Sequence, residues 1–423
     1  MGLLRHRLAV TLCLLGLAIV RPACADIVLA GVTEDRGAAA PAGTAFRNGY
    51  TLAIEEINAA GGVLGQRLQL RQFDIDTSEP AVREAMKSAM ALQPFAVMGP
   101  VFSGLTLAAM ASTAATATPH FTGGEAASLT RKFHPSLLRT SLTQQESIPR
   151  LAAFAVHGLG ARKLGVLWLD NEFGRSGHTV LQDAASRRGA KLAFDESVPP
   201  ATKDWGPVVQ RLMAAQVDAV VLLLTENEAV AALTELRARH FRPPVLGDGP
   251  LASTRVVGDP SGVAEGLIGH SGISVDLPNP RMAQFVADYQ RRFGGRPDHN
   301  SLKGYFAVQA LRMGLEATGQ ADRAAVLAYL KDARLDGRRQ PALMTAWVRY
   351  DMFGDLNRES YILQAHAGKM RLVATMSALD TSFATLPDGR SLALDSDEFR
   401  NAARALLDDA DGTRLAAHPH SKH

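Results

Sequence analysis

The chain has 423 residues, of which 45 are Lys or Arg and 42 are Asp or Glu, so its formal charge at pH 7 is only +3. This balance argues against a basic surface that binds nucleic acid or an anionic membrane. Two cysteines are too few for a framework of several disulfides, and the length is sufficient for two or three domains with buried apolar cores.

The first 25 residues have the three-part pattern of a secretory signal peptide. Arg5 and Arg7 precede an apolar stretch over residues 8–20, and Ala23-Cys24-Ala25 ends the segment with small residues. A membrane anchor is the first alternative, but these 13 residues are fewer than the roughly 20 that span a bilayer. The second alternative is a lipid attached to Cys24, although Arg21-Pro22-Ala23 lacks the leucine that usually stands three residues before a lipidated cysteine. We therefore expect cleavage after Ala25.

Cleavage at this point changes the chemistry of the chain. Both cysteines and three arginines, but no acidic residue, lie in the segment, so the mature chain would have no cysteine and zero formal charge. We expect a periplasmic protein without disulfides, without thiolate metal sites and without direct insertion into a membrane.

From Asp26 to about residue 142, short apolar strands alternate with amphipathic helices. In the first helix Phe46, Tyr50 and Ile57 recur at helical spacing, and Gly61-Gly62 follows as a cap. Thr77-Ser78-Glu79-Pro80 is typical of a helix start, since hydroxyls accept the first free amides and proline fits the first turn. The predicted strands are 26–32, 67–74 and 95–98, and the predicted helices are 45–58, about 79–92 and one that starts near Ser103.

The same alternation restarts after residue 143. The predicted strands are 163–169, 191–198, 218–224, 243–247, 345–350, 361–367 and 372–376, and the predicted helices are 177–188, 205–215, 226–239, 281–293 and 301–318. Two successive sets of such units predict an α/β protein with two doubly wound parallel-sheet lobes. From Leu386 onward, strands and helices no longer alternate. We expect one amphipathic helix at 392–408 and a frayed tail at 416–423.

Several short motifs in this order resemble the periplasmic leucine/isoleucine/valine-binding protein family, which has the type I periplasmic binding fold. Residues 57–65 (INAAGGVLG) are fairly specific to the family, and the resemblance covers residues 26–376. The other motifs are Asn48-Gly49, residues 74–76, Gly99 with Ser103 and Thr106, Glu172-Phe173-Gly174, and Ala264-Glu265-Gly266.

The resemblance implies two discontinuous lobes joined by a three-strand hinge, with crossings near residues 143, 274 and 354. The expected first lobe comprises 26–142 and 275–353, the second 143–274 and 354–385, and a C-terminal extension 386–423. A cleft between the lobes would close on a ligand by a hinge motion. The implied function is a substrate-binding protein of an ABC importer, with a small polar ligand such as an amino acid, amide or small acid. Its implied partner is a membrane permease.

The resemblance also suggests ligand residues in the first lobe. Ser103 matches a serine that holds a ligand carboxylate at a helix start, although a serine there also caps a helix in any protein. Gly123 and Gly124 allow a close approach to the backbone, and Gly123 would offer its carbonyl to an ammonium group. Glu125 stands where a threonine is usual, so it either points elsewhere or recognises a hydrogen-bond donor, unless it is simply solvated.

In the second lobe, Phe173 matches an aromatic residue that covers the ligand. The alternative is that its ring only packs against the helix that follows it. Thr225 stands where an aromatic residue is common, and Asp248 lies near the position of an acid that binds the α-ammonium group. Ala42, in a loop expected at residues 37–43, replaces another aromatic residue. These departures put leucine specificity in doubt.

Patterns that indicate catalysis or cofactors are missing from the sequence. Gly-x-Ser-x-Gly, His-Glu-x-x-His, Gly-x-Gly-x-x-Gly and the P-loop pattern do not occur, so neither an enzyme nor a nucleotide or metal cofactor is predicted. His418, His420 and His423 are more typical of a loose tail than of a metal site. The alternative function is a sensor that presents the same ligand to a receptor kinase or regulator.

Overall fold

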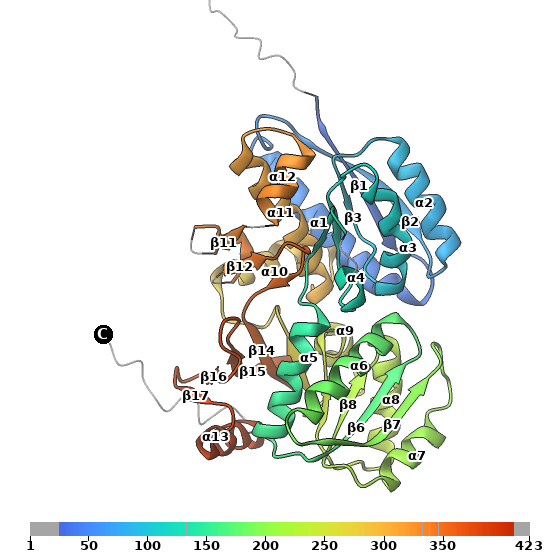
Figure 1. Cartoon of the computed structure of the whole chain (residues 1–423), viewed down its shortest axis with the longest axis vertical. Coiled ribbons are helices and arrows are strands. Elements are labelled where there is room, and N and C mark those ends of the chain that lie inside the picture. Colours follow the sequence, from blue (N-terminus) through green and yellow to red (C-terminus); the bar gives the residue numbers. More distant parts are fainter. Residues whose placement is uncertain (1–24, 132–133, 332, 338, 346, 410–423) are drawn as a thin grey trace, which may run out of the picture.

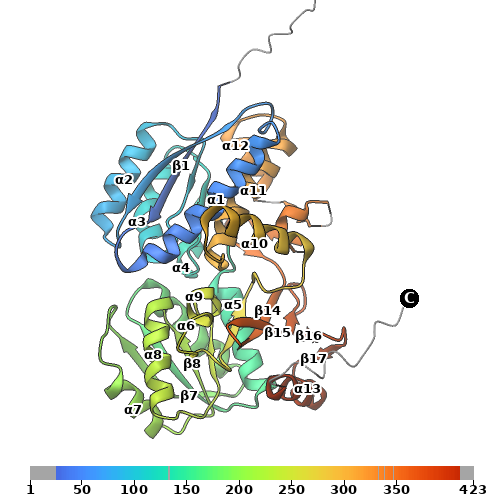
Figure 2. The ribbon, with the colours of Figure 1, turned by 180° about the vertical axis from the view of Figure 1, so that it is seen from behind.

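The computed structural model describes residues 25–131, 134–331, 333–337, 339–345 and 347–409. Residues 1–24, which hold nearly all of the expected signal peptide, and the histidine-containing tail lie outside these ranges. The described chain forms two α/β lobes, one above the other in Figure 1 and again in the reverse view of Figure 2. The predicted fold class is thereby confirmed.

The first lobe contains a five-stranded parallel sheet. Its strand order is β2-β1-β3-β4-β5, so neighbouring strands are joined by crossovers of the doubly wound kind. Apolar side chains pack on both faces, because helices cover both. The strands are β1 (Ile27–Glu34), β2 (Leu68–Ile75), β3 (Ala96–Met98), β4 (His120–Thr122) and β5 (Leu137–Arg139).

The helices of this lobe come from two separate stretches of the chain, residues 40–131 and 280–330. They are α1 (Ala40–Ala59), α2 (Glu79–Ala91), α3 (Ser103–Ala114), α4 (Ser128–Arg131), α10 (Pro280–Phe293), α11 (His299–Thr318) and α12 (Arg323–Leu330). Helices α1 and α11 cross closely at two glycines, since a Cβ on Gly49 would lie 1.9 Å from the Ser301 carbonyl oxygen and one on Gly304 2.0 Å from that of Phe46. This contact sets the start of α11 beside the cleft.

The second lobe contains a nine-stranded sheet of order β17-β16-β15-β14-β10-β9-β8-β6-β7. The five strands from β7 to β10 are parallel, and the other four are antiparallel. The strands are β6 (Lys163–Leu169), β7 (Lys191–Val198), β8 (Ala219–Leu223), β9 (Val245–Gly247), β10 (Ile268–Ser271), β14 (Ser360–His366), β15 (Lys369–Met376), β16 (Phe383–Thr385) and β17 (Ser391–Ala393). All five residues of β8 are buried, as expected of a strand covered on both faces.

The second-lobe helices are α5 (Gln144–Ala153), which continues as a π-helical turn (Phe154–Gly158), α6 (Glu172–Ser186), α7 (Gly206–Ala214), α8 (Glu226–Ala238), α9 (Thr254–Val257) and α13 (Asp397–Asp408). A small antiparallel sheet of β11 (Arg334–Asp336), β12 (Trp347–Tyr350) and β13 (Leu356–Asn357) lies near the junction of the lobes. The chain passes between the lobes after β5, after β10 and after β13. The residue boundaries of the lobes stay a proposal.

Three helices begin elsewhere than the sequence pattern predicted. Helix α1 begins at Ala40, five residues early, because Pro41 fits its first turn, so Ala42 is helical and not in a loop. Helix α6 begins at Glu172, since the Asn171 side chain accepts a 2.9 Å hydrogen bond from the Gly174 amide. Helix α13 begins at Asp397, because the preceding residues pair as β17.

Candidate functional site

A cavity of about 420 Å³, the central cavity, lies between the two lobes and is lined by both. From the first lobe it is lined by residues around the starts of α1, α3 and α11 and by the loop after β4. The second-lobe wall consists of the residues around the starts of α6 and α8, together with residues 200–201, Pro250 and Arg255. The loops that follow parallel strands therefore meet at one place, as such sheets favour.

Helix N-termini meet at the central cavity. Ser103 begins α3, Glu172 begins α6, Glu226 begins α8 and His299 begins α11, and all four residues line the cavity. The first amides of a helix have no partner within the helix, and its N-terminus bears a partial positive charge. The cavity therefore offers several positions for an anionic group or a carbonyl oxygen.

Ser103 is buried and lines the central cavity, but it is not the cap of α3. Phe102 holds the cap position, and the Ser103 hydroxyl accepts hydrogen bonds from the amides of Glu125 (3.2 Å) and Ala126 (3.1 Å). The hydroxyl proton is still available to donate. Ser103 thus links the start of α3 to the loop after β4 and can donate to a ligand.

The two glycines of this loop have different surroundings. Gly123 lines the central cavity, and its carbonyl oxygen accepts hydrogen bonds from Ser141 Oγ (3.3 Å) and Lys303 Nζ (3.4 Å). Gly124 is absent from the described lining of the cavity, and a Cβ there would lie 2.7 Å from Leu129 Cδ1. A side chain at position 124 would therefore displace the buried Leu129 side chain.

Glu125 forms a buried ion pair with Lys303, with 2.7 Å between Oε1 and Nζ. Burial raises the pKa of the Glu125 carboxyl, while Lys303 opposes that effect. The other carboxylate oxygen, Oε2, is buried and has no hydrogen-bond partner among the described residues. Of the alternatives left open by the sequence, Glu125 is neither solvated nor directed away from the cavity.

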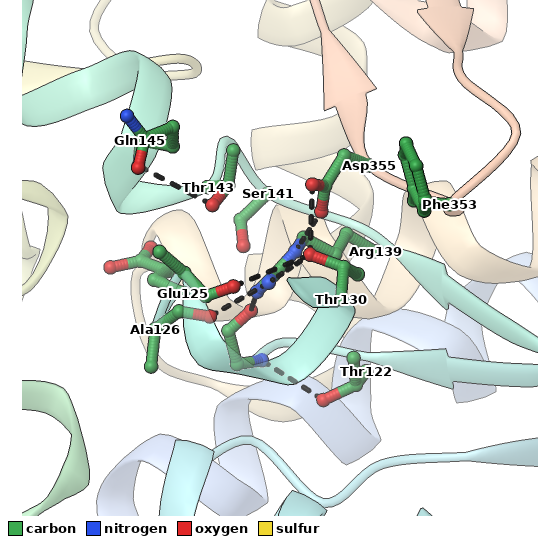
Figure 3. Close-up of polar contacts among 12 residues, drawn as sticks. Thr122, Glu125, Ala126, Thr130, Arg139, Ser141, Thr143, Gln145, Phe353 and Asp355 are labelled. Atoms are coloured by element: carbon green, nitrogen blue, oxygen red, sulfur yellow. Dashed lines mark hydrogen bonds and ion pairs between the residues drawn. The ribbon is translucent and has the colours of Figure 1, made fainter. Parts of the chain in front are cut away.

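Arg139, the last residue of β5, holds the Glu125 loop from behind (Figure 3). Its guanidinium donates to the carbonyl oxygens of Gly124 and Ala126, each at 2.7 Å, and pairs with Asp355 through Nε. The Arg139 side chain is fully buried. Because Asp355 precedes β13, this contact joins the cavity loop to the segment that leads into the second lobe.

Phe173 and Thr225 both lie on the second-lobe wall. Phe173 is in the first turn of α6, where its carbonyl oxygen accepts a 3.1 Å hydrogen bond from Gln144 Nε2. Thr225 has the cap position of α8, and its hydroxyl donates to Glu228. Ala42 lines the cavity across from them, on the first turn of α1.

Asp248 lies away from the central cavity, beside a second cavity of about 20 Å³, the inner cavity. Its carboxylate accepts a 2.6 Å hydrogen bond from Ser147 Oγ and lies 3.1 Å from His270 Nδ1. Glu125 and Lys303 border both cavities. The ligand role of Asp248 stays a prediction, and these two contacts account for its burial.

Several cavity residues were not among the sequence candidates. The Asn300 Nδ2 amide donates a 3.1 Å hydrogen bond to Glu226 Oε1, which connects the two lobes. Burial raises the pKa of Glu226 to about 7, and Asp298 adds to this effect. Neither Glu226 nor Lys303 has a sequence signal beyond its place on a predicted helix, because only the folded chain brings α8 and α11 together.

Among the described residues, no three His, Cys, Asp or Glu side chains lie close enough together to hold a metal ion. Within those same ranges, the helices are also too short or too polar to cross a membrane.

The chain is similar to a family of binding proteins over most of its length. The family model for periplasmic binding proteins matches residues 26–370. The Leu/Ile/Val-binding protein homolog 8 of Brucella abortus (strain 2308) is 25% identical over 311 residues, which cover 70% of this chain and 77% of that protein. The Leu/Ile/Val-binding protein BraC3 of Rhizobium johnstonii is 25% identical over 362 residues, or 84% of this chain and 95% of that protein.

Solved structures share the fold. The leucine-binding protein LivK of Thermotoga maritima MSB8 superposes with a TM-score of 0.75 at 18% identity, covering 83% of this chain and 99% of that one. A solute-binding protein of an ABC transporter from Rhodopseudomonas palustris BisB5, in complex with 3,4-dihydroxybenzoic acid, superposes with a TM-score of 0.74 at 18% identity, covering 84% and 98%. The extent of the family match shows that this chain belongs to the periplasmic binding protein family, as the resemblance to the leucine/isoleucine/valine-binding proteins predicted.

Proposed function

We propose that the protein is the extracytoplasmic substrate-binding component of an ABC importer and that it captures an amino acid or a related small polar ligand. The observation that supports this most is the central cavity, which is bounded by helix N-termini of both lobes. Relatives named Leu/Ile/Val-binding proteins, and a solved neighbour from Streptococcus pneumoniae in complex with isoleucine, favour a ligand with a carboxylate.

The Ser103 hydroxyl and the amides at the start of α3 would bind that carboxylate, because a helix N-terminus favours an anion. Ser103, Gly123, Glu125, Phe173 and Thr225 are the sequence candidates on the cavity lining. Exclusion of water between the lobes would strengthen each polar contact with the ligand.

We further propose that the lobes close on the ligand by a hinge motion. Contacts across the cleft support a closed arrangement, since Asn227 Nδ2 donates to the Ala38 carbonyl oxygen at 2.9 Å and the Ala127 amide donates to Ser176 Oγ at 2.8 Å. In this proposal the chain is exported by its N-terminal segment, and the closed form is delivered to a membrane permease.

A thermal-shift screen tests the binding function. The panel contains amino acids, small amides, and short aliphatic or aromatic acids, and a ligand at 100 times its Kd should add about 2.7 kcal/mol of stability. Ser103→Ala should weaken binding of an α-amino acid ligand by roughly 1 to 3 kcal/mol, because it removes a buried hydrogen-bond partner. Ser186→Ala, at an exposed position of α6, is the control. A panel in which no compound raises the melting temperature would contradict the proposal.

A further inference from the structure

The second-lobe wall has three acidic side chains, Glu172, Glu226 and Glu228. Each accepts a hydrogen bond from a neutral group: the hydroxyl of Ser128, the amide of Asn300 and the hydroxyl of Thr225, respectively. Among the described residues none of the three forms an ion pair with Lys, Arg or His. This wall therefore has carboxylates without an ion-pair partner among the described residues, and they line the central cavity.

The cations on the cavity lining are Lys303 and Arg255, and both already have protein partners. Lys303 pairs with Glu125 at 2.7 Å. Arg255 donates through Nε (2.9 Å) and Nη2 (2.6 Å) to the side-chain oxygen of Asn227. Neither cation is within ion-pair distance of the three carboxylates, so a cationic group of a ligand could pair with them.

The first-lobe side of the cavity provides a separate observation. Glu125 Oε2 and Asn300 Oδ1 are buried acceptor atoms without a hydrogen-bond partner among the described residues, and both side chains line the cavity. When Glu226 is ionised it can only accept, so the Asn300 amide presents Nδ2 to it and directs Oδ1 elsewhere. A buried acceptor without a donor costs roughly 1–3 kcal/mol. The first lobe thus presents acceptors that lack donors, opposite the carboxylates of the second-lobe wall.

We propose that the ligand is a basic amino acid, whose side-chain cationic nitrogen binds between Glu226 and Asn300 while its carboxylate binds at the start of α3. The inference rests on the proposed binding function and specifies the ligand class. A cationic nitrogen with several N–H donors can donate to the unsatisfied first-lobe acceptors, and its charge can pair with a carboxylate of the second-lobe wall. A neutral aliphatic side chain does neither.

Calorimetric titration of the full mature chain tests this ligand class. The panel is L-arginine, L-lysine, L-leucine, benzoate and 1,5-diaminopentane, a diamine without a carboxylate. We expect L-arginine or L-lysine to bind at least tenfold more tightly than every other compound. Glu226→Gln, which keeps an oxygen for the Asn300 amide, should weaken that binding at least tenfold, and Glu226→Asp should restore most of it.

Glu235→Gln is the matched control, because Glu235 lies on the same helix and pairs with Arg239 outside the cavity. It should leave every affinity unchanged. Tighter binding of leucine, benzoate or the diamine by the wild-type chain would overturn the inference and leave the binding function intact, as would equal affinities of wild type and a folded Glu226→Gln variant. Should no compound of this panel bind the wild-type chain, the inference fails, and the proposed function fails with it only if the broader thermal-shift panel also gives no binder.

Discussion

The carboxyl group of Glu34 is buried within the first lobe, behind the central cavity. It ends β1, has no exposed surface, and accepts hydrogen bonds from the amides of Val101 (3.0 Å) and Phe102 (2.9 Å), which precede α3. Burial raises its pKa from the ordinary value of 4.5 to about 7, against the effect of these bonds, and the nearby Asp35 adds to the increase. Folded protein therefore binds a proton at pH values where unfolded protein has released it.

This shift predicts a pH-dependent stability. Because the folded state holds the extra proton, the free energy of unfolding should fall as the pH rises from 4.5 through 7, by roughly 3 kcal/mol in total from Glu34. Glu34→Gln keeps an acceptor for both amides and removes the titration. Urea unfolding between pH 5.5 and 8.5 should show the variant gaining stability relative to wild type as the pH rises. If the difference in unfolding free energy between the variant and wild type stays constant with pH, the prediction is wrong. Glu226 has a similar pKa, but its contribution is the same in both proteins and cancels.

Helix α13 shows how the C-terminal extension is attached. Ser396 caps it by accepting a 3.1 Å hydrogen bond from the Phe399 amide, and Phe399 and Ala403 are fully buried. The Phe399 ring meets Phe154 edge to face, with 6.2 Å between centroids. Both views place α13 against the second lobe, beside β16 and β17 (Figures 1 and 2). Residues 391–408 are therefore packed onto the second lobe. The amphipathic pattern at 392–408 was the only indication of this in the sequence.

Truncation of this helix contact should destabilise the protein. Phe399→Ala removes a fully buried ring and should lower the free energy of unfolding by about 3 to 5 kcal/mol. Phe383→Ala, on the neighbouring β16, is the control, since Phe383 is 43% exposed and its loss should matter much less. Guanidinium unfolding followed by circular dichroism gives both values. Similar losses in the two variants would mean that α13 contributes little to the second lobe.

The arrangement of the two lobes is held by contacts that cross the cleft. Asn227 reaches the backbone of Ala38, and Glu226 accepts from Asn300. Most of these groups are polar and lie at the cavity, so water can replace their partners when the lobes separate. These polar contacts are compatible with the proposed hinge motion, in which a ligand would shift the populations of two states.

Fluorescence energy transfer should report this motion. The sequence has cysteines only at positions 13 and 24, so labels can be attached at Lys87→Cys on α2 and Arg187→Cys after α6, where the side chains are 80% and 71% exposed. A ligand found in the thermal-shift screen should raise the transfer efficiency by moving the lobes together. Labels at Lys87→Cys and Glu316→Cys, both in the first lobe, should report no change. An inter-lobe signal that a saturating ligand leaves unaltered would rule out closure.

The alternation of apolar strands and amphipathic helices was enough to predict the fold class and most elements, and the short motifs, residues 57–65 above all, indicated the family. This succeeds because the periods of strands and helices are local properties that a sheet covered on both faces preserves. Helix starts were less accurate, as at α1 and α6, because a single cap or proline decides them. Ser103 and Phe173 could be proposed as site residues because both match positions of the family's motifs.

The pairing of site residues that lie far apart in the sequence could not be predicted from the sequence. Lys303 meets Glu125 from 178 positions away, and Asn300 meets Glu226 only because α11 and α8 belong to different lobes. Asp248 follows a strand like the other candidates, yet its partners Ser147 and His270 hold it at the inner cavity. Such contacts depend on how the lobes and their helices pack, through close approaches such as that of α1 with α11, and no local pattern encodes them.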